Sequence, residues 1–287
     1  MRDRLKTYYY LTKPGIIYGN GLAAIGGFLL ASRGQFNIWL FLAMLAGSSL
    51  VIASGCVFNN YLDRKIDARM ARTKKRALAC GRVSGRNALI YASILGASGF
   101  ILLAAFTNWL TVAIGLMGIV FYVIIYGFTK RHSVHGTLVG TISGATPPVA
   151  GYCAVTGRLD MGAILLFLIL VFWQMPHFYA IAIYRAKDYA AAKLPVLPVV
   201  KGIRATKIQM LAYVLGFILV SAMLTVSGYT GYVYLATMMI VGLVWLWRSL
   251  QGFGVSNDIV WARKMFGFSL VALLIFCLMI SIDNVLA

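Results

Sequence analysis

Glutamate is absent from this sequence of 287 residues, and aspartate supplies all seven of its acidic side chains. Charged residues of both signs make up only 11% of the chain, whereas soluble domains contain about 25%. Hydrophobic residues make up 61%. This composition excludes a soluble globular domain and identifies an integral membrane protein.

Cysteine is also sparse. The four cysteines are scattered without CxxC spacing, which excludes a disulfide framework or a zinc site as the organising feature: Cys56, Cys80, Cys153 and Cys277.

The first apolar run follows Pro14 and has no small-residue cleavage site close behind it. We therefore expect an uncleaved first membrane helix and not a signal peptide.

Long apolar runs are abundant. A helix needs about 20 residues to cross the hydrocarbon core of a membrane. Nine runs reach that length, with approximate limits of 15–33, 38–60, 87–106, 109–128, 136–156, 161–184, 208–228, 230–247 and 265–284. The sequence thus predicts an all-α bundle of about nine transmembrane helices in a single domain over residues 1–287.

A net charge of +19 would suit nucleic acid binding, but the basic residues are distributed according to the membrane. With the N-terminus in the cytoplasm, all but two of the 26 Lys and Arg residues lie on the inside, and only Arg33 and Arg158 lie outside. This is the positive-inside pattern, and with nine spans it places the C-terminus outside. The two long connections, 61–86 and 185–207, are cytoplasmic in this topology, so we expect a central cavity that opens to that side.

The segment NNYLDRKIDARMARTKKRALACG, residues 59–81, concentrates charge in an otherwise apolar chain. If the second membrane helix continues into it, Asn59, Asp63 and Asp67 lie on one helix face at steps of four residues. Oxygen ligands of this kind suit Mg²⁺, which is commonly shared between one or two carboxylates and substrate phosphates. The basic residues that follow are suited to the phosphate oxygens that the metal does not reach: Arg72, Lys74, Lys75 and Arg76. Two alternatives remain open: solvated ion pairs for the aspartates, and an anionic-lipid patch for the basic run.

This motif, Asn-x3-Asp-x3-Asp followed by Arg-Thr-x2-Arg, resembles that of the intramembrane prenyltransferase superfamily. Three further segments, KRHSVHGTLVGTISGATPPVAGY (130–152), WQMPHFYAIAIYRAKDY (173–189) and LPVLPVVKG (194–202), resemble the branch of that superfamily which transfers a farnesyl group to haem. The resemblance extends through nearly the whole chain.

The resemblance implies a role for each matching position. Mg²⁺ would be held by Asn59, Asp63, Asp67 and Asp188, of which the three aspartates would be catalytic. The diphosphate of the donor would be bound by Asn59, Arg72, Arg76, Lys130, Arg131 and Arg185. The second acidic motif commonly reads Asp-x3-Asp, but its first position is Tyr184 here, which puts a symmetric two-metal site in doubt.

Two features inside apolar runs indicate a cavity. His177 lies about two turns before the inside end of its span, where a polar ring is a functional candidate. With a haem acceptor, His177 and Tyr184 would contact the macrocycle; a hydrogen-bonded packing histidine is the equally good alternative. Pro147 and Pro148 should break or kink the run 136–156, and such breaks occur where a cavity or protein groups satisfy the freed backbone.

The implied reaction is the Mg²⁺-dependent transfer of farnesyl from farnesyl diphosphate to a vinyl group of haem B, giving hydroxyethylfarnesyl haem for haem-copper oxidases. Prenylation of an aromatic quinone precursor is the alternative with the same donor chemistry, and a membrane transporter is the alternative from another class. The expected location is the bacterial inner membrane, with the active site facing the cytoplasm. The expected partners are the two substrates, the lipid bilayer, and a terminal oxidase or haem-modifying enzyme; nucleic acid is not among them.

Overall fold

The computed structural model describes residues 2–284, so Met1 and the last three positions of the expected domain lie outside the described part. Within it the protein is helical, and its only β pairing is an isolated bridge between Thr230 and Asn284. Eight helices are long and apolar enough to cross a membrane. The prediction of an all-α membrane bundle is confirmed.

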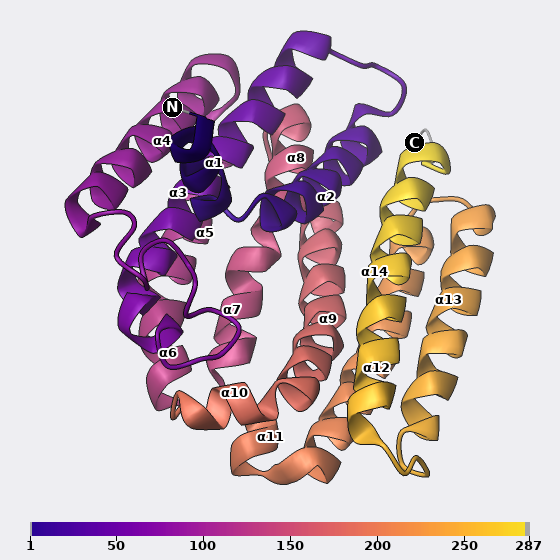
Figure 1. Cartoon of the computed structure of the whole chain (residues 1–287). Coiled ribbons are helices and arrows are strands. Elements are labelled where there is room, and N and C mark those ends of the chain that lie inside the picture. Colours follow the sequence, from indigo (N-terminus) through magenta and orange to yellow (C-terminus); the bar gives the residue numbers. More distant parts are fainter. Residues whose placement is uncertain (1, 285–287) are drawn as a thin grey trace.

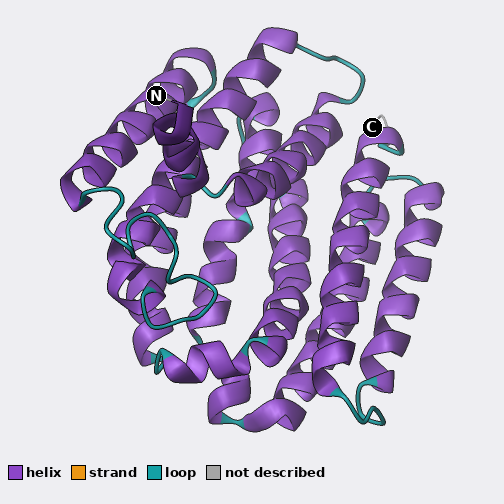
Figure 2. Ribbon diagram, viewed as in Figure 1, coloured by secondary structure: helices purple, strands orange, loops and turns teal. Residues whose placement is uncertain are grey.

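Figures 1 and 2 show these helices as a bundle with short helices at its ends. The eight candidate spans are α2 (Pro14–Ser32), α3 (Ile38–Asp67), α4 (Gly85–Phe106), the continuous run of α5 (Trp109–Val120), η1 (Phe121–Ile125) and α6 (Tyr126–His132), then α9 (Met161–Tyr184), α12 (Gly202–Val226), α13 (Tyr232–Gln251) and α14 (Asp258–Ile282). A short polar helix that hydropathy did not predict, α1 (Arg2–Leu11), precedes them.

The apolar run 136–156 forms two short helices instead of one. α7 (Gly136–Gly144) ends just before Ala145, and α8 (Thr146–Thr156) begins just after it. Pro147 and Pro148 occupy the first turn of α8, where a missing backbone N–H costs no helical hydrogen bond. The expected break is confirmed. With this pair the bundle accommodates all nine apolar runs, while the number of membrane crossings stays a prediction.

The boundaries of the two long connections were wrong. α3 continues to Asp67, seven residues beyond the predicted end of its span, so the first connection is 68–84 and not 61–86. The second connection contains α10 (Ala186–Ala191) and α11 (Leu197–Val200) and ends where α12 begins at Gly202. Hydropathy marks where a helix leaves the apolar region, but a helix without Gly or Pro can continue beyond that point.

Close packing between α2 and α8 brings the break in the α7–α8 pair against the first span. A Cβ atom on Gly27 would overlap the carbonyl oxygen of Pro148, and one on Gly151 would overlap that of Ala24. Small residues allow membrane helices to approach to backbone contact in this way. At one end of the bundle Met70 from the first connection packs on Ala192 and Leu194 of the second, so the two connections form one structure.

Candidate active site

A cavity of about 530 Å³ lies inside the bundle. Its walls come from α2, α3, α4, α5, η1, α6, α7, α8, α9 and α14, and both connections contribute to it. Polar side chains gather in one part of the lining: Asn59, Asp63, Asp67, Arg72, Arg76 and Lys130. Elsewhere the lining is mainly apolar and aromatic, with residues that include Ile52, Ile119, Leu170, Trp173, Phe178, Ile181, Leu270 and Leu273. The cavity can therefore hold a molecule with a charged head and a long apolar part.

The three motif side chains of α3, Asn59, Asp63 and Asp67, all line this cavity. Asn59, Asp63 and Asp67 are 3%, 9% and 3% exposed, although two of them are carboxylates. Their spacing of four residues along an unbroken helix places them on one face, as expected. Buried carboxylates require partners, because an isolated charge is costly to remove from water.

Asp67 obtains its partner from the connection that follows. Arg76 Nη1 donates to Asp67 Oδ1 at 3.0 Å and to Oδ2 at 2.9 Å. The Thr73 hydroxyl donates to the Asp67 carbonyl oxygen at 2.9 Å, and the Arg76 backbone N–H donates to the Thr73 carbonyl oxygen at 2.9 Å. These bonds fold the basic segment back over the end of α3, so that Arg76 faces the cavity.

Asp63 is paired with two cations from α6. Lys130 Nζ donates to Asp63 Oδ2, and Arg131 donates to Oδ1 at 3.2 Å. Arg131 also donates to the carbonyl oxygen of Leu62 at 2.9 Å, which anchors its guanidinium beside α3. Each carboxylate of the motif thus carries at least one basic partner within the cavity wall.

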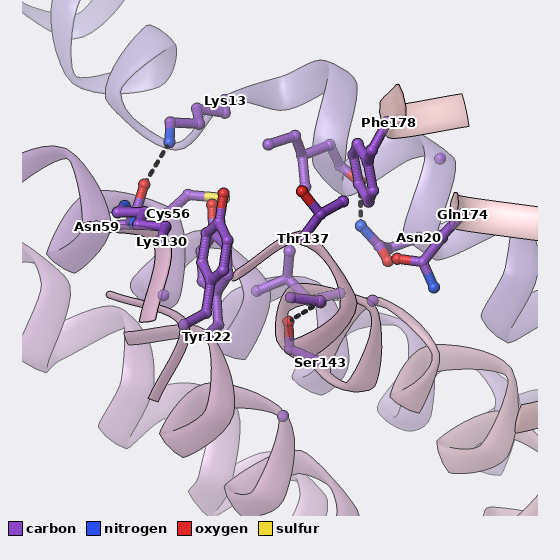
Figure 3. Close-up of a pocket in the computed structure, with 18 of the residues that line it drawn as sticks. Lys13, Asn20, Cys56, Asn59, Tyr122, Lys130, Thr137, Ser143, Gln174 and Phe178 are labelled. Carbon is purple, nitrogen blue, oxygen red and sulfur yellow. Dashed lines mark hydrogen bonds between the residues drawn. The ribbon is translucent and has the colours of Figure 1, made fainter. Parts of the chain in front are cut away.

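Asn59 contacts Lys13, which precedes α2. Lys13 Nζ donates to Asn59 Oδ1 at 3.0 Å (Figure 3). Burial lowers the pKa of Lys13 to about 8. The other amide atom, Asn59 Nδ2, is buried and has no hydrogen-bond partner within residues 2–284. A buried polar atom of this kind costs free energy unless a ligand or water completes its bonding.

The donor set of α3 fits Mg²⁺. The Asn59 amide oxygen and the two carboxylates offer hard oxygen ligands on one face, and the buried amide Nδ2 of Asn59, an N–H donor, suits a phosphate oxygen beside such a metal. Within residues 2–284 no three His, Cys, Asp or Glu side chains form a metal-binding group. The protein therefore provides no complete cage, and water or substrate phosphate would supply the remaining ligands, as is usual for Mg²⁺.

Aromatic rings from η1 and α6 line the cavity beside this polar group. Tyr122 and Tyr126 stack with ring centroids 5.9 Å apart and planes 7° apart, and Lys130 Nζ lies 4.9 Å from the Tyr126 centroid. Figure 3 shows Tyr122 next to Cys56 and Asn59. η1 is a π-helical turn, a distortion that often occurs at functional sites.

His177 lies in an aromatic enclosure in the cavity wall. Its ring centroid is 4.8 Å from those of both Trp173 and Phe266. Its Nδ1 lies 2.7 Å from the hydroxyl oxygen of Ser269, and that hydroxyl donates its one hydrogen to the Phe266 carbonyl oxygen at 2.6 Å. Nδ1 must therefore be the donor to Ser269, which leaves Nε2 with a lone pair.

Comparison with known protein families assigns the chain to a family. The model of the UbiA prenyltransferase family matches residues 21–279. The chain belongs to the UbiA prenyltransferase family. It is an enzyme that transfers prenyl groups, so the resemblance read from the sequence is confirmed and the transporter alternative is excluded.

Curated members of this family include relatives that are similar over nearly the full length. The protoheme IX farnesyltransferase of Yersinia enterocolitica serotype O:8 / biotype 1B (strain NCTC 13174 / 8081) is 54% identical over 280 residues, which cover 97% of this chain and 95% of the relative. That of Citrobacter koseri (strain ATCC BAA-895 / CDC 4225-83 / SGSC4696) is 54% identical over 279 residues, covering 97% and 94%.

Solved structures share the UbiA fold at lower identity. A digeranylgeranylglyceryl phosphate synthase structure matches with a TM-score of 0.81 at 20% identity, over 98% of each chain. A UbiA homolog from Archaeoglobus fulgidus bound to GPP and Mg²⁺ matches with a TM-score of 0.71 at 14% identity, over 96% of this chain and 100% of that one.

Most of the site residues expected in this UbiA chain come together. The cavity is lined by Asn59, Asp63, Asp67, Arg72, Arg76, Lys130 and His177. Arg131 joins this group through its ion pair with Asp63. The residues of the second motif do not line the cavity. Arg185 Nη1 lies 3.7 Å from Asp188 Oδ2, and the ring centroids of Tyr184 and Phe266 are 6.0 Å apart. Roles for these three residues stay predictions.

Other cavity residues were not anticipated from the sequence. The membrane helices contribute Asn20 and Gln174, and a polar side chain inside an apolar run is a signal that could have identified both. Tyr189 lines the cavity in place of its neighbour Asp188, and burial raises the pKa of its hydroxyl. Nothing local to Lys13 or Tyr122 distinguishes either from ordinary interface residues.

Proposed function

We propose that this UbiA enzyme transfers the farnesyl group of farnesyl diphosphate to a vinyl group of haem B, with Mg²⁺, giving hydroxyethylfarnesyl haem. The observation that carries the proposal is the shape and chemistry of one cavity, in which a buried carboxylate and basic group adjoins an apolar and aromatic space. The name shared by the full-length relatives supports haem as acceptor.

The polar end would bind the donor head. Asn59, Asp63 and Asp67 would hold Mg²⁺, which supplies Lewis acidity to the diphosphate oxygens when bound. Arg72, Arg76 and Lys130 line the same region and would bind the oxygens that the metal leaves free, with Arg131 behind them. Positive charge placed in advance around the departing diphosphate lowers the barrier to breaking the allylic C–O bond.

The apolar part of the cavity would hold the farnesyl chain and exclude water while the allylic cation exists. The vinyl group forms the new C–C bond with that cation, and water then adds to the resulting haem-side cation and releases one proton. Tyr122 and Tyr126 offer ring faces that stabilise positive charge near the donor head. His177, with Nε2 free, would orient the macrocycle.

We also propose the wider setting predicted from the sequence. The whole chain would form one transmembrane domain in the bacterial inner membrane, N-terminus inside and C-terminus outside. The cavity would open to the cytoplasm near the two connections. Asp188 would hold a second metal ion opposite α3, with Arg185 and Tyr184 beside it. A terminal oxidase or a haem-modifying enzyme would be the partner that receives the product.

The test is a product assay on the purified protein in detergent with haem B, farnesyl diphosphate and Mg²⁺. We expect haem that is heavier by a farnesyl group plus one water, and no such product when a chelator removes the metal or when Asp63 is replaced by Ala. Unmodified haem, together with prenylation of a phenolic acid by the same preparation, would transfer the assignment to a quinone precursor. Product formed in full without divalent metal would reject the role of α3 as a metal site.

A further inference from the structure

A second cavity lies between α1 and the basic connection 68–84. Its volume is also about 530 Å³. Five cationic side chains line it, and Asp3 is the one acidic side chain among the described lining residues; the cations are Lys6, Lys13, Lys75, Arg76 and Arg82. Because positive charge is in such excess, the potential inside this second cavity favours anions.

Two of these cations belong to both cavities. Lys13 and Arg76 line the reaction cavity as well as the second one. On the reaction side Lys13 donates to Asn59 and Arg76 binds both oxygens of Asp67. The two side chains therefore form a basic wall that separates the reaction site from the second cavity.

Two of the remaining three cations, Lys6 and Lys75, are available for a ligand. Among the described residues, Lys6 and Lys75 take part in no ion pair, and Asp3 does not neutralise either of them. Arg82 has a structural role, because its guanidinium donates to the Lys75 carbonyl oxygen and, at 3.2 Å, to Cys80 Sγ. These bonds hold the Lys75 backbone in place at the second cavity.

We propose that the second cavity is a binding site for phosphate-class anions, and that it receives inorganic diphosphate as this leaving group departs from the reaction cavity. The ammonium groups of Lys6 and Lys75 bind phosphate oxygens as point charges, and Lys13 and Arg76 pass the anion from one cavity to the other. The release role rests on the proposed function, while the anion site itself does not.

Chemistry explains why such a site is useful. Breaking the allylic C–O bond leaves a multiply charged diphosphate that can leave only towards the cytoplasmic side, because the apolar membrane offers it no exit. A neighbouring cavity on that side that offers the ammonium groups of Lys6 and Lys75 lowers the free energy of the first step outward. An anionic lipid could supply the same phosphate chemistry from the membrane surface, so the experiment must separate the two sources.

The test is calorimetric titration of the full-length protein with inorganic diphosphate, in neutral detergent with a chelator and without donor or acceptor. We expect the double variant Lys6→Gln/Lys75→Gln to bind diphosphate about tenfold more weakly than the wild type. The variant Lys187→Gln/Lys264→Gln has the same net charge, and because its exposed lysines line neither cavity it should bind like the wild type. Lys6→Arg/Lys75→Arg should retain binding, which distinguishes lost charge from misfolding.

Equal affinity in all four proteins, each with a wild-type melting temperature, would overturn the proposal. Repeating the titration in nanodiscs of phosphatidylcholine with and without phosphatidylglycerol separates the sources. Unchanged affinity supports diphosphate as the ligand; competition by phosphatidylglycerol overturns the release role and assigns the site to a lipid headgroup. Because no turnover occurs in the titration, failure of the product assay would not alter its result.

Discussion

Lys13 Nζ and Asn59 Oδ1 lie 3.0 Å apart, although 46 positions separate the two residues in the chain. The contact connects the start of α2 to the first position of the Asn-x3-Asp-x3-Asp face on α3. It brings a further cation to the face whose carboxylates are contacted by Lys130, Arg131 and Arg76.

The first prediction concerns the pH dependence that Lys13 confers. Burial lowers the pKa of Lys13 to about 8, so the side chain is charged below that pH and neutral above it. Affinity for farnesyl diphosphate should therefore fall by about tenfold as pH rises through this value, the effect of losing one charge-assisted hydrogen bond. The measurement is KM for the donor on both sides of pH 8, and Lys13→Arg, which stays charged, should show a smaller decline.

Stability should change in the opposite direction. Between the lowered pKa and the ordinary Lys pKa of 10.5, the unfolded chain binds more protons at this residue than the folded protein. The contribution of Lys13 to the free energy of unfolding therefore increases with pH in that window.

A donor affinity that stays constant through pH 8 in the wild type would contradict the assignment of Lys13 to the donor head.

The second prediction concerns Asp63. Asp63→Asn removes a charge that Lys130 and Arg131 both contact, and it weakens the proposed metal site, so prenyl transfer should fall by about 10²-fold or more. The measurement is the initial rate of product formation at saturating donor. Asp160→Asn is the matched control: Asp160 caps α9 through Ala163, and because Asn caps equally well the rate should not change.

A double-mutant cycle would test whether Asp63 and Lys130 act together. The variants are Asp63→Asn, Lys130→Met and their combination. The observable is the change in the free energy of unfolding, obtained from the melting temperature without substrate. Each single change should destabilise the fold, and the combination should destabilise it by less than the sum, with a coupling of about 0.5–3 kcal/mol. Strict additivity would show that the ion pair contributes nothing to the empty enzyme.

The third prediction concerns the tautomer of His177. His177→Ala should lower affinity for haem B by about tenfold or more, and Ser269→Ala should cause a smaller loss because the ring is no longer held through Nδ1. Absorbance titration with haem B measures both effects. Ser281→Ala on the same helix provides a control, since Ser281 bonds only to the Cys277 carbonyl oxygen. Wild-type haem affinity in His177→Ala would support a packing histidine.

The fourth prediction concerns the contact of α2 with α8. Gly27→Ala would place a methyl group on the Pro148 carbonyl oxygen, so the two helices must separate, at a cost of about 1–3 kcal/mol. Thermal unfolding in detergent measures this cost as a lower melting temperature. Gly267→Ala, where a Cβ meets no atom within 4 Å, should melt at or above the wild-type temperature. Equal melting of both variants would contradict the close approach.

The sequence predicted those parts of the site that depend on local geometry. The step of four residues from Asn59 to Asp63 to Asp67 needs only a continuous helix, and α3 provides it. Pro147 and Pro148 forecast the break between α7 and α8 because proline cannot continue a helical hydrogen-bond ladder.

What the sequence could not predict depends on tertiary packing. Lys13 is one more basic residue before a membrane helix until the fold brings it to Asn59. No sequence pattern distinguishes the π turn of η1 from an ordinary α-helix. The stacking of Tyr122 on Tyr126 was therefore not predicted. The resemblance indicated Asp188 from its motif position, but Tyr189 is the residue of that turn that reaches the cavity.

The ion pairs at Asp63 and Asp67 have a thermodynamic consequence. Without substrate, the carboxylates and the cations neutralise each other. In the proposed reaction complex the carboxylates would turn to the metal and the cations to the diphosphate, so each charge would exchange its counter-ion. Either ligand bound by itself would leave the charges of the other sign unmatched. On this proposal metal and diphosphate would bind with positive cooperativity, and each would raise the affinity for the other by the same factor.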